Sequence, residues 1–394
     1  MVSIPRDYLF STHTVLTHLK LGGIVRKSFE APIGSPLSAM EVLIIGLLYF
    51  KFNPSENEYW SLYLESIPSQ YTSLIFWPSE ALPLLGSKRL AERVNHRLSK
   101  ISGLFEHTRN TFQKFHDSTC AFQLKFLHEF SLDSFLWAYA TIMSRSVFVR
   151  NAALWNTDLR LEKDIAALPP LLDFFNHSNE TECSASYNLS TQCYELRTEQ
   201  AWAPGDQQVF IKYGHHSNAT LLLHYGFAIP NNIYDSIDLD LDLHQLIDGT
   251  VECEAKLLKL HEFGLIDPPV RPKSANRLKH TLSMDGIGWN TMVAIKTMLM
   301  DSKEETECWD ALLEDSPISP NNEMKYGRYC KALYQSMLHK IEEGERIASS
   351  TIEAAEPTTS SSAPTSWSTY LHLSSIYRAC CRLILNNALA HIDS

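Results

Sequence analysis

The eight cysteines of this 394-residue sequence include no pair at the C-x-x-C spacing. The common structural zinc sites and the disulfide frameworks of small secreted proteins both depend on regularly placed cysteines, so neither is expected. Buried thiols in a reducing compartment are the expected state. The opening residues, MVSIPRDYLF, also lack the charged-then-apolar layout of a secretory signal.

Long hydrophobic runs and an excess of positive charge are missing as well. The longest apolar run, Val42–Phe50, is about half the length that a membrane span needs. The formal net charge of −11 disfavours direct binding to nucleic acid through phosphate neutralisation, and suits a basic peptide better. We therefore expect a nuclear or cytosolic protein with a protein partner, without a membrane or nucleic acid partner. The oligomeric state stays open.

The sequence does contain the material for a folded chain of two domains, with 44% hydrophobic and 20% charged residues. Short β-prone segments bounded by turn residues predict strands at Tyr187–Leu189, Tyr194–Arg197, Gln208–Lys212 and Ile237–Leu243. Apolar periodicity predicts helices at Met40–Phe50, Tyr59–Ile67, from Ser87 onward, at Ser134–Val147 and at Asn218–His224. From about His244 to the end, the chain is predicted to be helical, with a flexible loop at Glu356–Ser366.

A row of basic residues follows the helix that begins near Ser87. Arg89, Arg93, Arg97 and Lys100 recur at helical spacing beside an apolar row. The basic row could bind an acidic partner surface, but any surface helix shows charges beside its apolar face. We therefore expect a solvated helix face.

Polar residues with possible chemical roles gather in two segments. Asp173, Asn176 and His177 directly follow an apolar run, where each unpaired polar group would cost about 1–3 kcal/mol. Downstream, period-two alternation places Tyr213 on the inward face of a strand, and Tyr225-Gly226-Phe227 adds two more aromatic rings. Aromatic rings with hydroxyls suit a cationic, methyl-bearing centre. Taken singly, the segments would also fit an ordinary turn and an aromatic core.

The joint order of these motifs decides between the two interpretations. It runs through Arg145, Asp173, Asn176-His177, Tyr213-Gly214, Ser217-Asn218 and Tyr225-Gly226-Phe227, followed by Leu282–Gly286 and Trp289. This order and spacing resemble the SET-domain methyltransferases of the Rubisco large-subunit lysine methyltransferase class. Within this class, the residues of these motifs most resemble the branch called SET domain-containing protein 4. The resemblance covers nearly the whole chain.

The resemblance implies an α+β fold with a SET-domain β core, a helical insertion and a mostly α-helical C-terminal domain. The SET domain would cover residues 1–243, with the insertion at about 30–135. Residues 244–394 would form the helical substrate-binding domain of this class.

The resemblance also assigns roles to individual residues. Asn176 and His177 would hold the amino-acid end of S-adenosyl-L-methionine, Arg145 would line the cofactor pocket, and Phe227 would pack on the adenine or ribose. Tyr213 would be the catalytic tyrosine, where the sulfonium and the substrate amine meet, and it would contact the cofactor. Tyr225 and Asp173 would border the substrate. The chemistry requires no metal ion.

One family feature is absent from this sequence. Members carry a Gly-x-Gly cofactor loop before the strand that ends in Ile-Pro, whereas only Val2 and Ser3 separate Met1 from Ile4-Pro5. Gly22-Gly23 follow the first expected helix and cannot replace that loop. We therefore expect an N-terminally truncated chain that binds its cofactor weakly and has reduced activity.

The function implied is S-adenosyl-L-methionine-dependent protein-lysine N-methylation of a histone or another nuclear or cytosolic protein. Two alternatives stay open. The same branch of enzymes includes a protein-histidine methyltransferase, so the acceptor nitrogen could belong to an imidazole. The chain could also be a non-catalytic interaction module derived from a SET domain.

Overall fold

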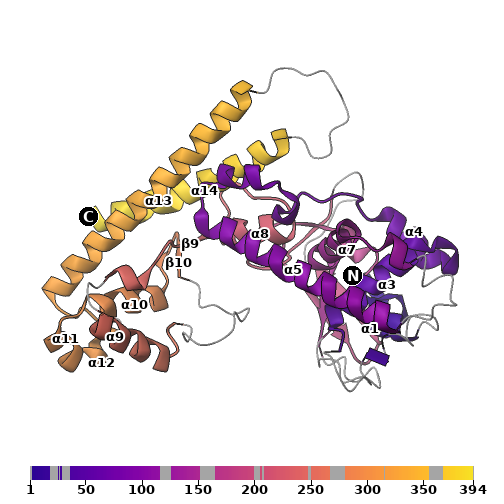
Figure 1. Cartoon of the computed structure of the whole chain (residues 1–394), viewed down its shortest axis with the longest axis horizontal. Helices are drawn as coiled ribbons and strands as arrows, with labels where there is room; N and C mark the ends of the chain where they lie inside the picture. Colours follow the sequence, from indigo (N-terminus) through magenta and orange to yellow (C-terminus); the bar gives the residue numbers. More distant parts are fainter. Residues whose placement is uncertain are drawn as a thin grey trace. The chain divides into compact units, whose positions relative to one another are not determined.

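The computed structural model describes residues 2–17, 25, 27–28, 36–115, 126–150, 165–198, 205, 208–246, 250–266, 280–314, 316–354 and 367–393. The chain forms two compact units (Figure 1). The first comprises Met1–Phe76, Asn95–His215 and Leu223–Gly226, and the second comprises Trp77–Val94, His216–Leu222 and Phe227–Ser394. The long helix α5, Lys88–Phe115, contributes residues to both units.

The first unit contains short strands in three groups. An antiparallel sheet has the order β1-β7-β6, a second has the order β2-β4-β3, and β5 pairs in parallel with β8. Their bounds are β1 Val2–Pro5, β2 Phe10–Ser11, β3 Val147–Val149, β4 Ile165–Leu168, β5 Asn176–His177, β6 Cys183–Asn188, β7 Cys193–Thr198 and β8 Phe210–Ile211. The expected strands around residues 187, 194 and 210 are thereby confirmed.

These strands share one hydrophobic core. It is formed by Ile4, Leu9, Val149, Ala167, Leu172, Tyr194, Leu196 and Ile211. Phe175 and Tyr213 pack against it while remaining partly buried. The core therefore fixes the ends of β5 and β8, where the predicted site residues begin.

Helices make up the rest of the first unit. Helix α3 is apolar all round and buries Val42–Phe50, and a capping box between Ser38 and Glu41 fixes its start. The other helices are α1 Thr12–Thr17, α4 Glu58–Ser66 and α7 Leu132–Arg145, with α3 at Ala39–Phe52. Short 3₁₀ turns occur at Arg6–Tyr8, Pro54–Glu56, Leu74–Phe76 and Leu172–Phe174.

The second unit is mostly helical. Helices α13 and α14 are its longest elements and pack against each other side by side (Figure 1). The helices are α8 Asn218–His224, whose last two residues belong to the first unit, α9 Thr250–Glu262, α10 Trp289–Leu299, α11 Ser302–Glu307, α12 Trp309–Leu313, α13 Pro320–Ala354 and α14 Trp367–Asp393. Short 3₁₀ turns lie at Ser79–Leu85 and Leu243–Leu246. The expected helix at Asn218–His224 is confirmed.

The chain after about residue 244 is mostly helical, as expected, but it also contains two short strands that were not expected. Strand β9, Ser236–Asp238, is shorter than predicted, and it pairs with β10, Thr281–Ser283, which pairs in turn with β11, Gly286–Ile287. Because β10 lies more than 40 residues after β9 in the chain, local periodicity gives no sign of their pairing. Residues 302–313 form two short helices, α11 and α12, separated at Cys308.

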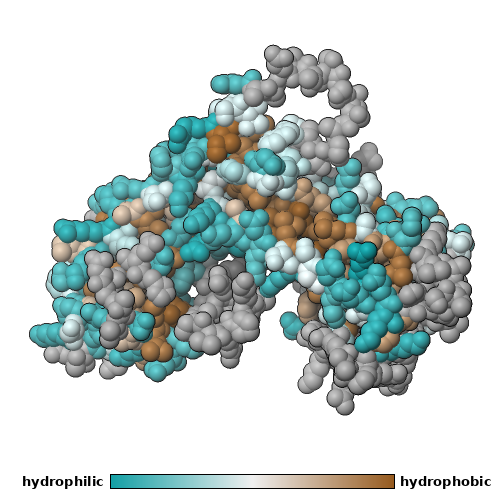
Figure 2. Space-filling model, in the orientation of Figure 1, coloured by the Kyte–Doolittle hydropathy of each residue, from teal (hydrophilic) through white to brown (hydrophobic). Residues whose placement is uncertain are grey.

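The solvated-face interpretation of the basic row is wrong for three of its four residues. Arg89 donates to the Leu241 carbonyl at 2.7 Å, and Arg93 Nη1 lies 2.7 Å from Asp238 Oδ2. Arg97 donates to the Tyr139 hydroxyl at 2.7 Å. Lys100 is exposed as expected, and Figure 2 shows hydrophilic residues over the outer face of this part of α5. Asp238 and Asp240, which lie far from α5 in the sequence, pair with Arg93 and Arg89, and helical periodicity cannot reveal such pairs.

The mixed helix and strand content confirms the α+β class. The domain division at residue 243 and the insertion at about 30–135 stay predictions. Gly22-Gly23 and the Glu356–Ser366 loop lie outside the described residues. Within the described segments, no helix combines the length and hydrophobicity that crossing a membrane requires.

Candidate active site

A buried ion pair between Arg145 and Asp173 lies at the centre of the first group of predicted site residues. Arg145 is the last residue of α7, and Asp173 lies in the 3₁₀ turn Leu172–Phe174. Arg145 Nη1 donates to the Asp173 backbone carbonyl at 3.0 Å and to Oδ2 at 3.1 Å. The Asp173 side chain has no exposed surface. Tyr63 of α4 completes the group by donating its hydroxyl to Oδ2 at 3.0 Å.

Burial dominates the electrostatics of this group. It raises the pKa of Asp173, although Arg145 and the Tyr63 hydroxyl act in the opposite direction. Burial, reinforced by the Asp173 charge, raises the pKa of Tyr63 well above its ordinary value. Tyr63 therefore remains a neutral hydrogen-bond donor, and desolvation offsets part of the attraction between Arg145 and Asp173.

The backbone leading into this turn is strained. Leu171 precedes the turn with a φ of 73°, in the left-handed region that residues with a Cβ seldom adopt. Such a conformation costs on the order of 1–3 kcal/mol, and it persists where surrounding contacts over-determine it. Here those contacts include the two hydrogen bonds from Arg145 to Asp173.

Tyr213 and His177 form a second group at the paired ends of β5 and β8. The Tyr213 backbone N–H donates to His177 Nδ1 at 3.1 Å, and the Tyr213 hydroxyl donates to the Phe175 carbonyl at 2.7 Å. The phenol ring stacks on the His177 imidazole, with centroids 5.1 Å apart at 24°, and lies 5.1 Å from the Tyr225 ring. Tyr213 is therefore fixed by hydrogen bonds at its backbone and its hydroxyl and by contacts with two aromatic rings.

The two tyrosines of this group are neutral at physiological pH. Burial raises the pKa of Tyr213 to about 12, and burial also raises the pKa of Tyr225. Each phenol thus retains its proton and can donate a hydrogen bond. Stacked neutral aromatic rings present electron-rich faces, which suit a cation or a methyl-bearing sulfonium.

Alkaline pH should destabilise the protein through these tyrosines. Their folded-state pKa values lie above the unfolded value near 10, so between about pH 10 and 12 the folded chain holds more protons. The free energy of unfolding should therefore be unaffected by them below pH 10 and should fall as the pH rises above it. Urea unfolding at stepped pH, with tyrosinate absorbance followed in parallel, measures this effect. A stability that stays level from pH 10 to 11.5 would contradict it, and Tyr213→Phe should make the decline shallower.

Gly226 holds the Tyr225 loop against residues Thr72 and Ser73. Its φ is 80°, and a Cβ at this position would lie 2.4 Å from Thr72 Oγ1 and 2.5 Å from the Ser73 backbone nitrogen. Thr72 Oγ1 donates to the Gly226 carbonyl at 2.7 Å. Only glycine allows this close approach with a positive φ.

Replacing Gly226 with alanine should lower the free energy of unfolding. The loss should exceed the cost of placing an alanine at a positive φ, because the added Cβ would also clash with Thr72 and Ser73. The matched control is Gly264→Ala, because Gly264 has a φ of 69° but no atom within 4 Å of the added Cβ. The control should lose about 1–2 kcal/mol from backbone strain. Gly226→Ala should lose at least about 1–3 kcal/mol more, because overpacking adds to that strain. Urea denaturation of both variants measures the difference, and equal losses would contradict the role assigned to the Thr72 contact.

The structure brings most of the predicted site residues into these two groups. Arg145 and Asp173 form the first, and His177, Tyr213 and Tyr225 belong to the second. Asn176 lies on β5 with an exposed side chain. Phe227 belongs to the second unit, so its placement at the cofactor stays a prediction. The individual roles of all these residues also stay predictions.

Three participants were not foreseen from the sequence. Tyr63 reaches Asp173 across 110 positions, and the Tyr71 hydroxyl lies 2.8 Å from Thr141 Oγ1 beside Arg145. The third is the backbone carbonyl of Phe175. The aromatic content of α4 was the only available signal, and it does not distinguish a site residue from core.

The polar atoms that lack partners agree with a zwitterionic ligand. Arg145 Nε and Asp173 Oδ1 are buried and have no hydrogen-bond partner among the described residues. One is a donor suited to a carboxylate, and the other is an acceptor suited to an ammonium group. Among these residues, no three His, Cys, Asp or Glu side chains are placed to share a metal ion.

Comparison with known proteins places this geometry in context. No family model matches the chain. SET domain-containing protein 4 of Mus musculus is 29% identical over 327 residues, which are 82% of this chain and 68% of that protein. The protein of the same name from Artemia parthenogenetica is 25% identical over 355 residues, covering 89% and 79%. The actin-histidine N-methyltransferase of Gallus gallus is 27% identical over 235 residues, covering 58% and 37%.

Solved structures agree in fold. The SET domain of LSMT bound to lysine and AdoHcy matches with a TM-score of 0.68 at 17% identity, covering 99% of this chain and 80% of that one. Rubisco LSMT bound to AdoMet matches with a TM-score of 0.66, also at 17% identity, covering 99% and 81%. The expected SET-type fold is thereby confirmed. The chain is thus similar in sequence to SET domain-containing protein 4 and has the fold of the Rubisco LSMT SET domain.

Proposed function

We propose that this protein is an S-adenosyl-L-methionine-dependent protein-lysine N-methyltransferase acting on a histone or another nuclear or cytosolic protein. Homology to SET-domain protein methyltransferases supports the general class. The observation that carries the proposal is the arrangement of Tyr213, whose hydroxyl donates to the Phe175 carbonyl while its ring contacts those of His177 and Tyr225.

The cofactor would be held by the residues around the two groups. Arg145, with its unpartnered Nε, suits the carboxylate of the amino-acid end. Asn176 and His177 would hold the same end of the cofactor, as the family resemblance implies. Phe227 would contribute an aromatic surface for the adenosine part. When bound, S-adenosyl-L-methionine supplies an electrophilic methyl group on a positively charged sulfonium.

The residues at the acceptor side favour a neutral nitrogen. Free lysine has a pKa near ~10.4, and a half-buried aromatic channel disfavours its charged form. Tyr213 and Tyr225 provide neutral phenols, which do not stabilise an ammonium as a carboxylate would. The Asp173 charge is engaged by Arg145 and Tyr63. Tyr213 would then orient the nitrogen lone pair, so that rate acceleration comes mainly from positioning.

Histidine is the second candidate acceptor. A relative that is 27% identical over 58% of this chain is an actin-histidine N-methyltransferase. An imidazole needs no pKa reduction to present a neutral nitrogen at physiological pH, since its ordinary pKa is about 6.5. The same aromatic group could therefore accept either side chain.

A labelling experiment tests the proposal and separates the acceptors. The protein is incubated with methyl-labelled S-adenosylmethionine and nuclear and cytosolic extracts, and the products are hydrolysed to amino acids. Label on lysine supports the proposal, and label on histidine supports the alternative. No product, together with partners recovered independently of S-adenosylhomocysteine, would instead favour a non-catalytic interaction module.

A further inference from the structure

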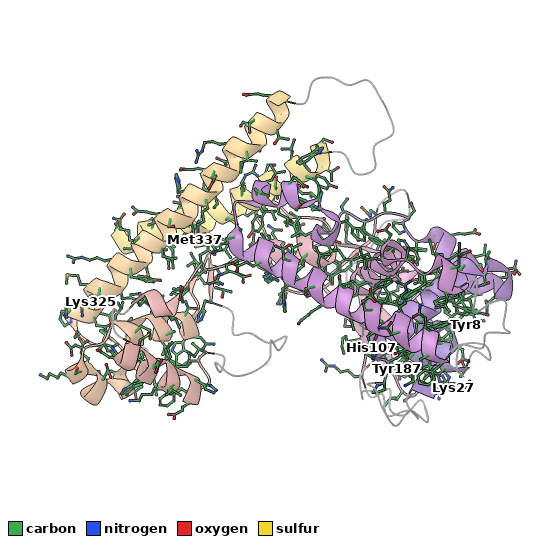
Figure 3. All side chains as sticks on the ribbon, in the orientation of Figure 1. Tyr8, Lys27, His107, Tyr187, Lys325 and Met337 are labelled. Carbon is green, nitrogen blue, oxygen red and sulfur yellow. The ribbon has the colours of Figure 1, made fainter. Side chains whose placement is uncertain are left out.

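The outward side of α4 carries an aromatic and aliphatic patch in the first unit. Tyr8, Tyr59 and Leu62 are 50%, 38% and 60% exposed, and the Tyr8 and Tyr59 rings meet edge to face at 5.1 Å. Tyr8 lies at the outer margin of the unit in the view of Figure 3. A cluster of large exposed side chains of this kind typically marks an interaction site. These three residues are called the α4 patch below.

The chain segment that contains α4 is acidic. Residues 52–76 contain three glutamates and no lysine, arginine or histidine. Glu58 and Glu65 are exposed one turn on either side of Leu62, and neither forms an ion pair with a described residue. The nearby Arg6 is engaged with Asp7 at 3.2 Å. Among the described residues of this segment, the patch therefore combines aromatic faces with carboxylates.

The α4 patch is linked to the first group of the candidate site through the buried residue Tyr63. Tyr63 lies one helical turn beyond Tyr59 and donates to Asp173. Tyr59 itself feels the Asp173 charge, which contributes to its raised pKa after burial and Tyr8. A segment bound on the patch would thus lie one turn of helix from the group that contains Arg145.

We propose that the α4 patch docks an arginine- or lysine-rich segment of the protein substrate, flanking the residue that is methylated. This rests on the proposed function. Guanidinium groups stack on aromatic faces and pair with carboxylates, and both elements are present. The aliphatic stems of such side chains would cover Leu62.

Fluorescence anisotropy with a short fluorescein-labelled peptide of arginines and alanines around one lysine tests this proposal. The double variant Glu58→Gln/Glu65→Gln should weaken binding about fivefold, as two partly exposed ion pairs allow, and Tyr59→Ala should weaken it by a similar factor. Binding should also weaken with added salt. The matched control, Glu342→Gln/Glu343→Gln on the exposed face of α13, removes the same charge elsewhere and should leave binding unchanged.

Equal weakening in the matched control would show diffuse attraction to an acidic protein and overturn the proposal. So would self-association of the wild type that Leu62→Ala abolishes, since the patch would then bind a second copy. Calorimetry with S-adenosylhomocysteine on every variant keeps the two proposals separate. Peptide binding lost with cofactor binding intact concerns only the patch, whereas absent cofactor binding in the wild type counts against the methyltransferase itself.

Discussion

Tyr213→Phe is expected to lower the methyl-transfer rate by on the order of 10²–10³-fold, the effect of removing one preorganised polar group from an active site. The substitution keeps the ring that contacts His177 and Tyr225 and removes only the hydroxyl. That hydroxyl is fixed by its bond to the Phe175 carbonyl, so its loss removes the oriented polar atom and leaves the aromatic surroundings in place. The initial rate on the acceptor identified by labelling measures the effect.

The control for this prediction is Tyr187→Phe. Tyr187 lies on β6 and packs against the same hydrophobic core, but it belongs to neither group of the candidate site. Its variant should retain the wild-type rate. Near-ultraviolet circular dichroism should be unchanged in both variants, which excludes a folding defect. An unchanged rate and unchanged number of methyl groups for Tyr213→Phe would remove this residue from the catalytic role.

Asp173→Ala should destabilise the protein by about 3–5 kcal/mol, the usual result of removing one member of a buried ion pair. Arg145 would keep its charge with 17% of its side chain exposed, and the Tyr63 hydroxyl would lose its acceptor. The raised pKa of Asp173 indicates that the desolvation of this carboxylate offsets much of its favourable interaction with Arg145. The main penalty therefore comes from the cation left behind.

Two further variants sharpen this prediction. Asp393→Ala removes an aspartate from the exposed pair with Lys331, where both side chains are about half exposed, and it should cost at most about 1 kcal/mol. The double variant Arg145→Met/Asp173→Leu should be more stable than Asp173→Ala, because no unpaired charge remains. Urea denaturation measures all three. A double variant no more stable than the single one would contradict this account.

The sequence was enough to predict most residues of the candidate site, but not the contacts between them. Asp173, His177 and Tyr213 stood out because polar and aromatic residues followed apolar segments in a recognisable order. The strand alternation that turned Tyr213 inward agrees with its packing on the core. That Arg145 binds Asp173, and that Tyr63 joins them, could not be read from the sequence, since neither contact has a local periodic signature.

The sequence by itself determined the amphipathic and apolar helices, the short strands of the core and the order of motifs that identifies the SET-type fold. These follow from local periodicity, capping and spacing, which act over a few neighbouring residues. Only the tertiary structure decided that Arg89 and Arg93 pair with the acidic segment around residue 238, that β10 joins β9, and which partners surround Asp173. Those contacts join residues from tens to more than a hundred positions apart, and their free energy exists only once the chain has brought them together.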